Sequence, residues 1–236
     1  MTETLLPWPL RQFDAAIVDL DGTLVDTLGD FVEALKRTLN DLPAPFFGFP
    51  VDHTLVERMV GKGSEHLIKS LLKHVDAALT ATDLIALYEQ AWGHYQVHYQ
   101  AINGQYSAVY PGALQALQQW QAAGLRLACV TNKPTAFAQT LLAHKGLDHF
   151  FLHVVGGDAV ARKKPDPMPL LHACGLLGTQ PARTLMVGDS SNDAQAARAA
   201  GCPVLLVRYG YNHGEPVESA AADATTDALD RLRWAN

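Results

Sequence analysis

The sequence has little charge of either sign and no surplus of basic residues. Charged residues make up 18% of its 236 residues, and 18 Lys and Arg stand against 24 Asp and Glu, which gives a formal net charge of −6. Nucleic acids are bound by clusters of Lys and Arg, and the sequence contains no such cluster. We therefore expect neither DNA nor RNA as a partner.

Long apolar runs and closely spaced cysteines are also missing. No run approaches the roughly 20 apolar residues that cross a bilayer. The opening segment MTETLLPWPLR has an acid and two prolines where a signal peptide needs a basic end and a long apolar stretch. We expect no membrane partner and a cytoplasmic location. Cys129, Cys174 and Cys202 are widely spaced among apolar residues, so we predict buried free thiols.

The residues that are present predict an ordinary globular core, since 48% of them are hydrophobic. Four short apolar runs are typical of strands in a parallel sheet covered on both faces. The runs are residues 15–20, 125–130, 184–187 and 204–207. Helical patterns between them end at Gly124, Gly146 and Gly201, where a helix C-terminus favours a left-handed residue. This alternation predicts a Rossmann-like, doubly wound α/β fold, which binds ligands at the carboxyl ends of its strands.

The stretch 28–106 departs from this alternation. Its apolar residues recur at helical spacing throughout, and Ser64 is placed to cap one of the helices at its N-terminus. We predict an all-helical cap domain at 28–106, inserted into an α/β core that consists of residues 1–27 and 107–236.

Two acidic residues end the first predicted strand, in the segment DLDGTLVD. Residues two apart in an extended chain point to the same side, so Asp19 and Asp21 face one site, and Gly22 lets the chain turn sharply after them. Thr131 and Asn132 follow the second predicted strand. Each pair alone also fits ordinary turn residues.

Two further polar segments occur later in the chain. In KKPDP, proline-stiffened extended backbone lets Lys164 present a fixed positive charge, whereas Lys163 fits a surface lysine. The segment GDSSND after the third strand brings Asp189 and Asp193, and Asn192 or Asp193 can cap the helix that follows. The order of these four segments, each at the end of its own strand, is more specific than any one of them.

Taken together, the four segments resemble the motifs of the haloacid dehalogenase-like superfamily of phosphotransferases. The helical stretch between the first two motifs resembles that superfamily's cap. Within the superfamily, the chain is most similar to bacterial phosphoglycolate phosphatases in three segments. These are YPG at 110–112, VGGDAVARKKPDPMP at 155–169 and YGYNHGEP at 209–216.

The resemblance implies roles for the matching residues. Asp19 would be the nucleophile that forms an aspartyl-phosphate, and Asp21 would protonate the leaving alcohol and then activate water. Mg²⁺ would be held by Asp19, the backbone carbonyl of Asp21 and Asp189, with Asp193 outside the ligand shell. Thr131 and the backbone near Asn132 would bind phosphate, and Lys164 would supply a second positive charge. An acid at position 21 favours a phosphatase over a dehalogenase, because a halide leaving group needs no proton.

Substrate specificity is expected to come from the cap. The segment Gly61-Lys62-Gly63-Ser64 precedes a helix and could meet an anion, and we consider Lys62 as a contact for a substrate carboxylate, against a solvated lysine. The related phosphatases commonly carry asparagine at that position. His94 and His98 have metal-ligand spacing but no acid placed beside them, so we expect an exposed or interfacial helix face. His213 lies in a loop whose glycines and proline are typical of turns. The alternative is that His213 lies at the edge of the site.

We therefore expect a Mg²⁺-dependent phosphatase that acts on a small phosphorylated metabolite, first of all 2-phosphoglycolate. The alternatives are a phosphatase for a sugar or amino-sugar acid phosphate, a phosphomutase, or a phosphate-binding regulator without catalysis. The chain is expected to be a monomer or a homodimer.

Overall fold

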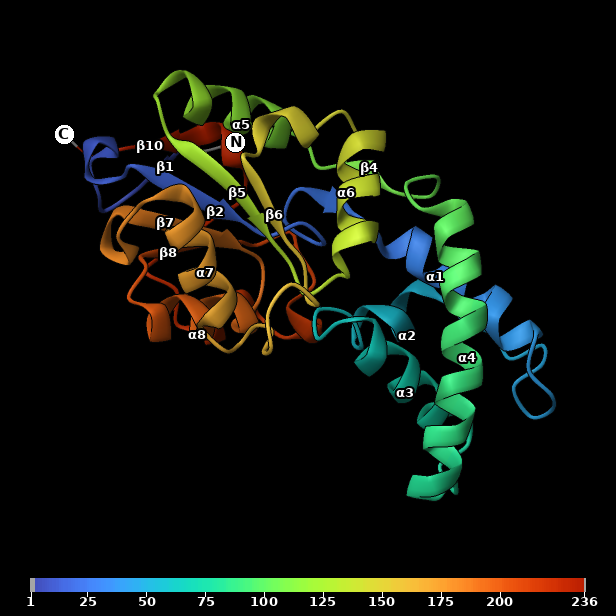
Figure 1. Ribbon diagram of the computed structural model, residues 1–236. Helices are drawn as coiled ribbons and strands as arrows, with labels where there is room; N and C mark the ends of the chain where they lie inside the picture. The colour runs from blue at the N-terminus through green and yellow to red at the C-terminus, as the bar shows by residue number, and fades with distance from the viewer. Residues whose placement is uncertain (1–2, 236) are drawn as a thin grey trace.

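The central element of the computed structural model is a six-stranded parallel sheet (Figure 1). The structure describes residues 3–235. The order across the sheet is β6-β5-β2-β7-β8-β9. Its strands are β2 Ala15–Val18, β5 Arg126–Val130, β6 His153–Val155, β7 Thr184–Gly188, β8 Val204–Val207 and β9 Ala224–Thr226. This is the order of a doubly wound fold, which confirms the predicted fold class.

Helices cover both faces of the sheet. They are α5 Ala113–Ala122, α6 Thr135–His144, α7 Met168–Leu177 and α8 Ser191–Ala200. Ala16 and Val18 of β2 join the hydrophobic cluster of α5 and α6, whereas Ala15 and Ile17 join that of α7 and α8. Alternate residues of one strand therefore serve two cores, and the buried strand reads as a continuous apolar run.

The direction of winding reverses between β2 and β7, which are neighbours in the sheet. Ligands of doubly wound sheets bind in the crevice at this reversal, outside the carboxyl ends of the strands. Asp19 directly follows β2, and Asp189 directly follows β7. The topology thus brings together two acidic residues that lie 170 positions apart in the chain.

Four helices form a second part of the molecule, seen on the right of Figure 1. They are α1 Leu28–Asn40, α2 His53–Glu57, α3 Ser64–Val75 and α4 Ala81–Ile102. Their buried apolar residues form a third cluster, joined by Tyr211 from the loop after β8. The antiparallel pair β3 Val25–Asp26 and β4 Ala108–Val109 lies where the chain enters and leaves these helices. A further short pair, β1 Thr4–Leu5 and β10 Leu232–Arg233, joins the two ends of the described chain.

Several local predictions are confirmed and some are corrected. Gly124, Gly146 and Gly201 all have positive φ, and the three cysteines are buried and free. Ser64 is wrong as an N-cap by one position, because Gly63 takes that place and Ser64 begins the helix. Strands β6 and β9 were not predicted, since three residues each are too short to show a pattern. No helix in residues 3–235 has the length and apolar character to cross a membrane.

Candidate active site

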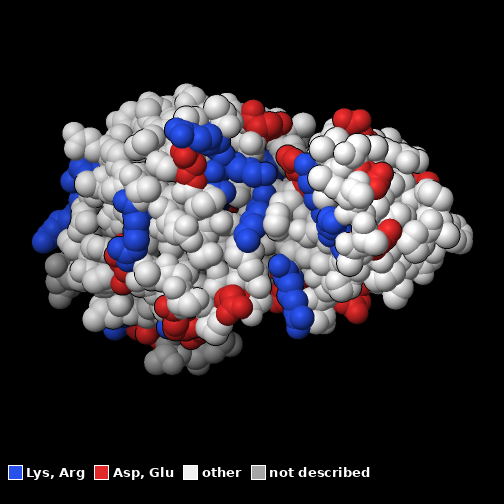
Figure 2. All heavy atoms as spheres, turned by 90° about the horizontal axis from the view of Figure 1, so that it is seen from below, with Lys and Arg blue, Asp and Glu red and all other residues white. Residues whose placement is uncertain are grey.

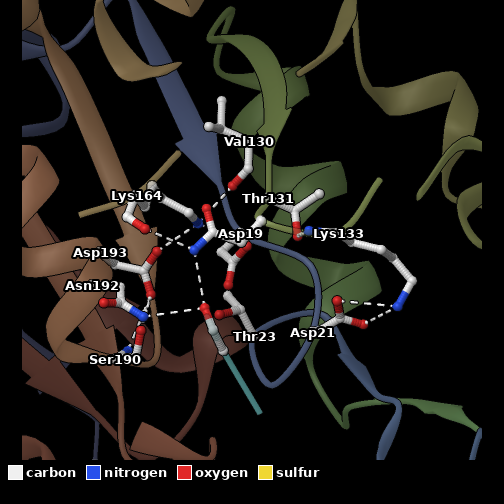
Figure 3. A network of polar contacts seen from close by, with 12 residues as sticks. Asp19, Asp21, Thr23, Val130, Thr131, Lys133, Lys164, Ser190, Asn192 and Asp193 are labelled. Atoms are coloured by element: carbon white, nitrogen blue, oxygen red, sulfur yellow. Dashed lines mark hydrogen bonds and ion pairs between the residues drawn. The ribbon is translucent and has the colours of Figure 1, made fainter. Parts of the chain in front are cut away.

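Asp19 and Lys164 form the buried centre of the candidate site (Figure 3). Lys164 Nζ lies 2.8 Å from Asp19 Oδ1, 2.6 Å from Asp193 Oδ1 and 2.8 Å from the Val130 carbonyl. Although burial alone would lower the pKa of this lysine, Asp19 and Asp193 raise it above its usual range. Lys164 is therefore a fixed cation, hydrogen-bonded to Asp193 and the Val130 carbonyl and ion-paired with Asp19.

Three carboxylates converge beside this lysine. Asp19, Asp189 and Asp193 each place an oxygen within 4.8 Å of the others, and all three residues are buried. Asp189 accepts from the Tyr211 backbone N–H at 2.8 Å. Since one lysine faces three carboxylates, the cluster carries excess negative charge, and its oxygen donors suit a hard divalent cation. The predicted ligands Asp19 and Asp189 thus lie together, and Asp193 joins them.

The same crowding changes the proton affinity of two members of the cluster. Burial, together with repulsion from Asp193 and against the attraction of Lys164, raises the pKa of Asp19 to about 7. Burial and repulsion from Asp193 and Asp19 raise the pKa of Asp189 well above its usual value. A bound cation would favour the ionised carboxylates and so lower the pKa values of Asp19 and Asp189.

Asp193 also organises the start of α8. Its Oδ2 accepts from the Asp189 and Ser190 backbone N–H groups and from the Ser190 hydroxyl, in a capping box with Ser190 as N-cap. The sequence suggested Asn192 or Asp193 as the cap, and of these only Asp193 takes part in the box, at its third position. Because Oδ1 of the same carboxylate accepts from Lys164 Nζ, Asp193 links the start of α8 to the buried lysine of the site.

Asp21 is directed away from the other acids, toward a residue that sequence reasoning missed. Lys133 Nζ lies 2.9 Å from Asp21 Oδ1 and 3.2 Å from Oδ2. The ammonium also lies 4.4 Å from the ring centroid of Phe31 and 4.7 Å from that of Tyr99, which belong to α1 and α4. Lys133 directly follows Thr131-Asn132, so its position in the sequence was the available signal.

The two residues after β5 take different places in the site. Thr131 is buried at the cavity wall, and its hydroxyl accepts from the Lys133 backbone N–H at 3.2 Å. The side-chain amide of Asn132 donates to the carbonyls of Gly61 and Lys164, at 3.0 and 2.9 Å. Asn132 therefore connects three segments of the site.

A small cavity of about 30 Å³ lies between the sheet and the helical part. The sheet side supplies Asp19, Asp21, Thr131, Asn132, Lys133, Lys164, Ser190, Asn192 and Asp193, and the helical side supplies Phe31, Val60, Gly61, Gly63, Ser64 and Leu67. The side chains of the helical wall are thus apolar, apart from the Ser64 hydroxyl. Figure 2 shows Lys and Arg side chains on both sides of the junction between the two parts.

His213 lines the groove that adjoins this cavity, and it holds the loop between α2 and α3. Its Nδ1 is 2.8 Å from the Val60 carbonyl, its Nε2 is 3.2 Å from Asn192 Nδ2, and Asn192 also donates to the Gly61 carbonyl at 3.1 Å. In this arrangement Nδ1 carries the proton and Nε2 accepts, so the ring is neutral. Burial, and repulsion from Lys62, lower the pKa of His213.

The structure places three other candidate residues away from the cavity. Lys62 is exposed and lines an adjoining groove, not the cavity wall. His94 Nδ1 and His98 Nε2 lie 3.2 and 2.6 Å from Asp41 Oδ2. The expectation that no acid lies beside these histidines is therefore wrong, because Asp41 at the end of α1 is adjacent in space although distant in sequence.

Comparisons with known proteins agree with the geometry of the site. A family model described as haloacid dehalogenase-like hydrolase matches residues 13–201. A phosphoglycolate phosphatase of Cupriavidus necator is 43% identical over 220 residues, covering 92% of this chain and 90% of its own. One of Thiobacillus denitrificans is 40% identical over 223 residues, covering 94% of each chain. The crystal structure of a protein of Haemophilus somnus, described as a predicted phosphoglycolate phosphatase, superposes with a TM-score of 0.82 at 32% identity, covering 93% of this chain and 96% of its own.

Proposed function

Because the chain belongs to the haloacid dehalogenase-like hydrolases and is a phosphatase, we propose that it hydrolyses 2-phosphoglycolate to glycolate and phosphate. The observation that carries this proposal is the small cavity in which a buried Asp19–Lys164 pair lies beside a second acid–lysine pair. The names of the related phosphatases support the same substrate.

In the proposed reaction Asp19 attacks phosphorus. One carboxylate oxygen forms the bond to phosphorus while the glycolate oxygen leaves, and water then hydrolyses the aspartyl-phosphate. Asp21 donates a proton to the leaving oxygen and later takes one from the attacking water. Its place two residues after the nucleophile, with its carboxylate at the cavity wall, supports this role.

Groups around the phosphate position neutralise the negative charge of the substrate phosphate. We assign to Lys164 and the Thr131 hydroxyl the binding of phosphate oxygens, together with backbone N–H groups near Asn132. Asp19, the Asp21 carbonyl and Asp189 would hold Mg²⁺, and Asp193 would orient them. Mg²⁺ would offset the negative charge of the phosphate and of the acids.

The helical part is proposed to act as a cap domain, with boundaries at 28–106. Its separate hydrophobic cluster and its side of the cavity support this division. A sugar phosphate has many hydroxyl groups that need hydrogen-bonding partners when water is excluded. The largely apolar cap wall offers few, which favours a short substrate over the sugar-phosphate alternative.

The proposal is tested by comparing kcat/KM across substrates with and without Mg²⁺. The substrates are 2-phosphoglycolate, hexose phosphates, an amino-sugar acid phosphate and p-nitrophenyl phosphate. We expect activity that requires metal and is highest for 2-phosphoglycolate, and that disappears in Asp19→Asn. A hexose phosphate ranked first would overturn the substrate assignment, and full activity of Asp19→Asn would overturn the mechanism.

A further inference from the structure

Lys133 has no assigned role, although it is 3% exposed and lies at the wall of the cavity. Its N–H donors differ from those of Lys164 in what they contact. Lys164 is hydrogen-bonded to Asp193 and the Val130 carbonyl and ion-paired with Asp19. Lys133 has the two oxygens of one carboxylate, Asp21, and two aromatic rings around it.

The position of Lys133 beside Asp21 determines which part of the substrate its ammonium group can contact. Under the proposed function, on which this step rests, Asp21 meets the ester oxygen of the substrate. Lys133 Nζ is 2.9 Å from that acid, so it is next to whatever group the leaving alcohol carries close to its oxygen. In glycolate that group is a carboxylate, which one methylene carbon connects to the ester oxygen.

We propose that Lys133 is the binding site for this second negative charge. The ligand class is a phosphomonoester with a carboxylate on the carbon that bears the ester oxygen. The ammonium is held in place by Phe31 and Tyr99, whose stacked rings lie 5.7 Å apart between centroids and keep water from its far side. A charge-assisted hydrogen bond formed in such a dry site discriminates strongly against a neutral leaving group.

The rings also explain how the cap contributes without a charged residue of its own in the cavity. Phe31 lies on α1 and Tyr99 on α4, whereas Lys133 precedes α6 of the core. The carboxylate-binding site is complete only when the cap helices lie against the core. This assignment replaces Lys62, which is exposed in the groove outside the cavity.

The test uses two substrates that differ in one charge, 2-phosphoglycolate and ethyl phosphate. We expect wild-type protein to prefer 2-phosphoglycolate, and Lys133→Met to reduce the ratio of the two kcat/KM values about ten- to a hundredfold, as expected for a lost hydrogen bond to a charged group. Lys62→Met removes the same charge outside the cavity and should leave the ratio within about twofold of wild type. Circular dichroism and thermal unfolding establish that each variant is folded, and Lys133→Gln replaces Lys133→Met if the latter is not.

The outcomes separate this inference from the proposed function. If wild-type protein hydrolyses ethyl phosphate as well as 2-phosphoglycolate, the proposed substrate fails. If wild-type protein prefers 2-phosphoglycolate and a folded Lys133→Met or Lys133→Gln variant has the same ratio of kcat/KM values, Lys133 does not bind the carboxylate. In that case the inference alone is wrong. If Lys62→Met loses the preference for 2-phosphoglycolate over ethyl phosphate and the Lys133 variants keep it, Lys62 is the residue that binds the carboxylate, and the inference is wrong.

Discussion

The buried carboxylate of Asp19 should make the stability of the metal-free protein fall as pH rises. Its pKa is about 7 in the folded protein, mainly because burial disfavours the charged form, against an ordinary value of 3.8. Between these values the folded chain retains a proton that the unfolded chain has lost. The contribution of Asp19 to stability is therefore complete below about pH 4 and is lost as pH rises through about 7.

The size of this effect follows from the pKa difference. Each pKa unit corresponds to about 1.4 kcal/mol, so the full loss amounts to about 4 kcal/mol, of which roughly 2 to 3 kcal/mol falls between pH 5 and pH 8. A neutral asparagine in place of Asp19 has no such dependence. Groups that do not contact Asp19, such as His213, titrate in both proteins, so their contributions largely cancel when wild type and Asp19→Asn are compared. Loss of the Asp19 charge also lowers the pKa of Asp189, which adds to the difference in the same direction.

The assay is urea unfolding of chelator-treated wild-type and Asp19→Asn protein at intervals from pH 5 to pH 8. We expect the free energy of unfolding of wild type to fall relative to that of the variant by roughly 2 to 3 kcal/mol over this range. Adding Mg²⁺ at pH 8 should restore wild type more than the variant, since the ion binds the folded carboxylate cluster. A difference between the two proteins that does not change with pH would refute the electrostatic account of the site.

Three further predictions concern the neighbours of Asp19. Gly22→Ala would place its Cβ against Asp189 Oδ2 at a φ of +85°, so it should weaken activation by Mg²⁺ and lower stability by about 1–2 kcal/mol. Unchanged Mg²⁺ titration and unfolding curves would contradict this. His213→Ala removes the contacts to the Val60 carbonyl and Asn192, and should raise KM for 2-phosphoglycolate roughly three- to tenfold. An unchanged KM would show that His213 does not hold the loop between α2 and α3 for substrate binding. Asp21→Asn should lower kcat for 2-phosphoglycolate about 10²- to 10⁴-fold. With p-nitrophenyl phosphate the variant should still release an initial burst of p-nitrophenol, because that leaving group needs no proton. Loss of the burst would assign Asp21 another role.

The sequence by itself determined the local parts of this protein. Continuous apolar runs marked β2, β5, β7 and β8, since a strand buried on both faces leaves no room for polar residues. Helical periodicity marked α1, α3 and α4 of the helical part, and Gly201 marked the end of α8. The acids that follow β2 and β7 could be identified because parallel strands end at the same edge of a sheet.

What the sequence left open depends on contacts between distant segments. The pairing of Lys133 with Asp21 under Phe31 and Tyr99 joins the core to two cap helices, and no spacing in the chain encodes it. Asp41 meets His98 for the same reason, across α1 and α4. Only the packing of the cap on the core decides which lysine lies in a dry cavity and which lies in solvent. The sequence alone does not show this difference in burial, which determines how strongly each positive charge can bind an anion.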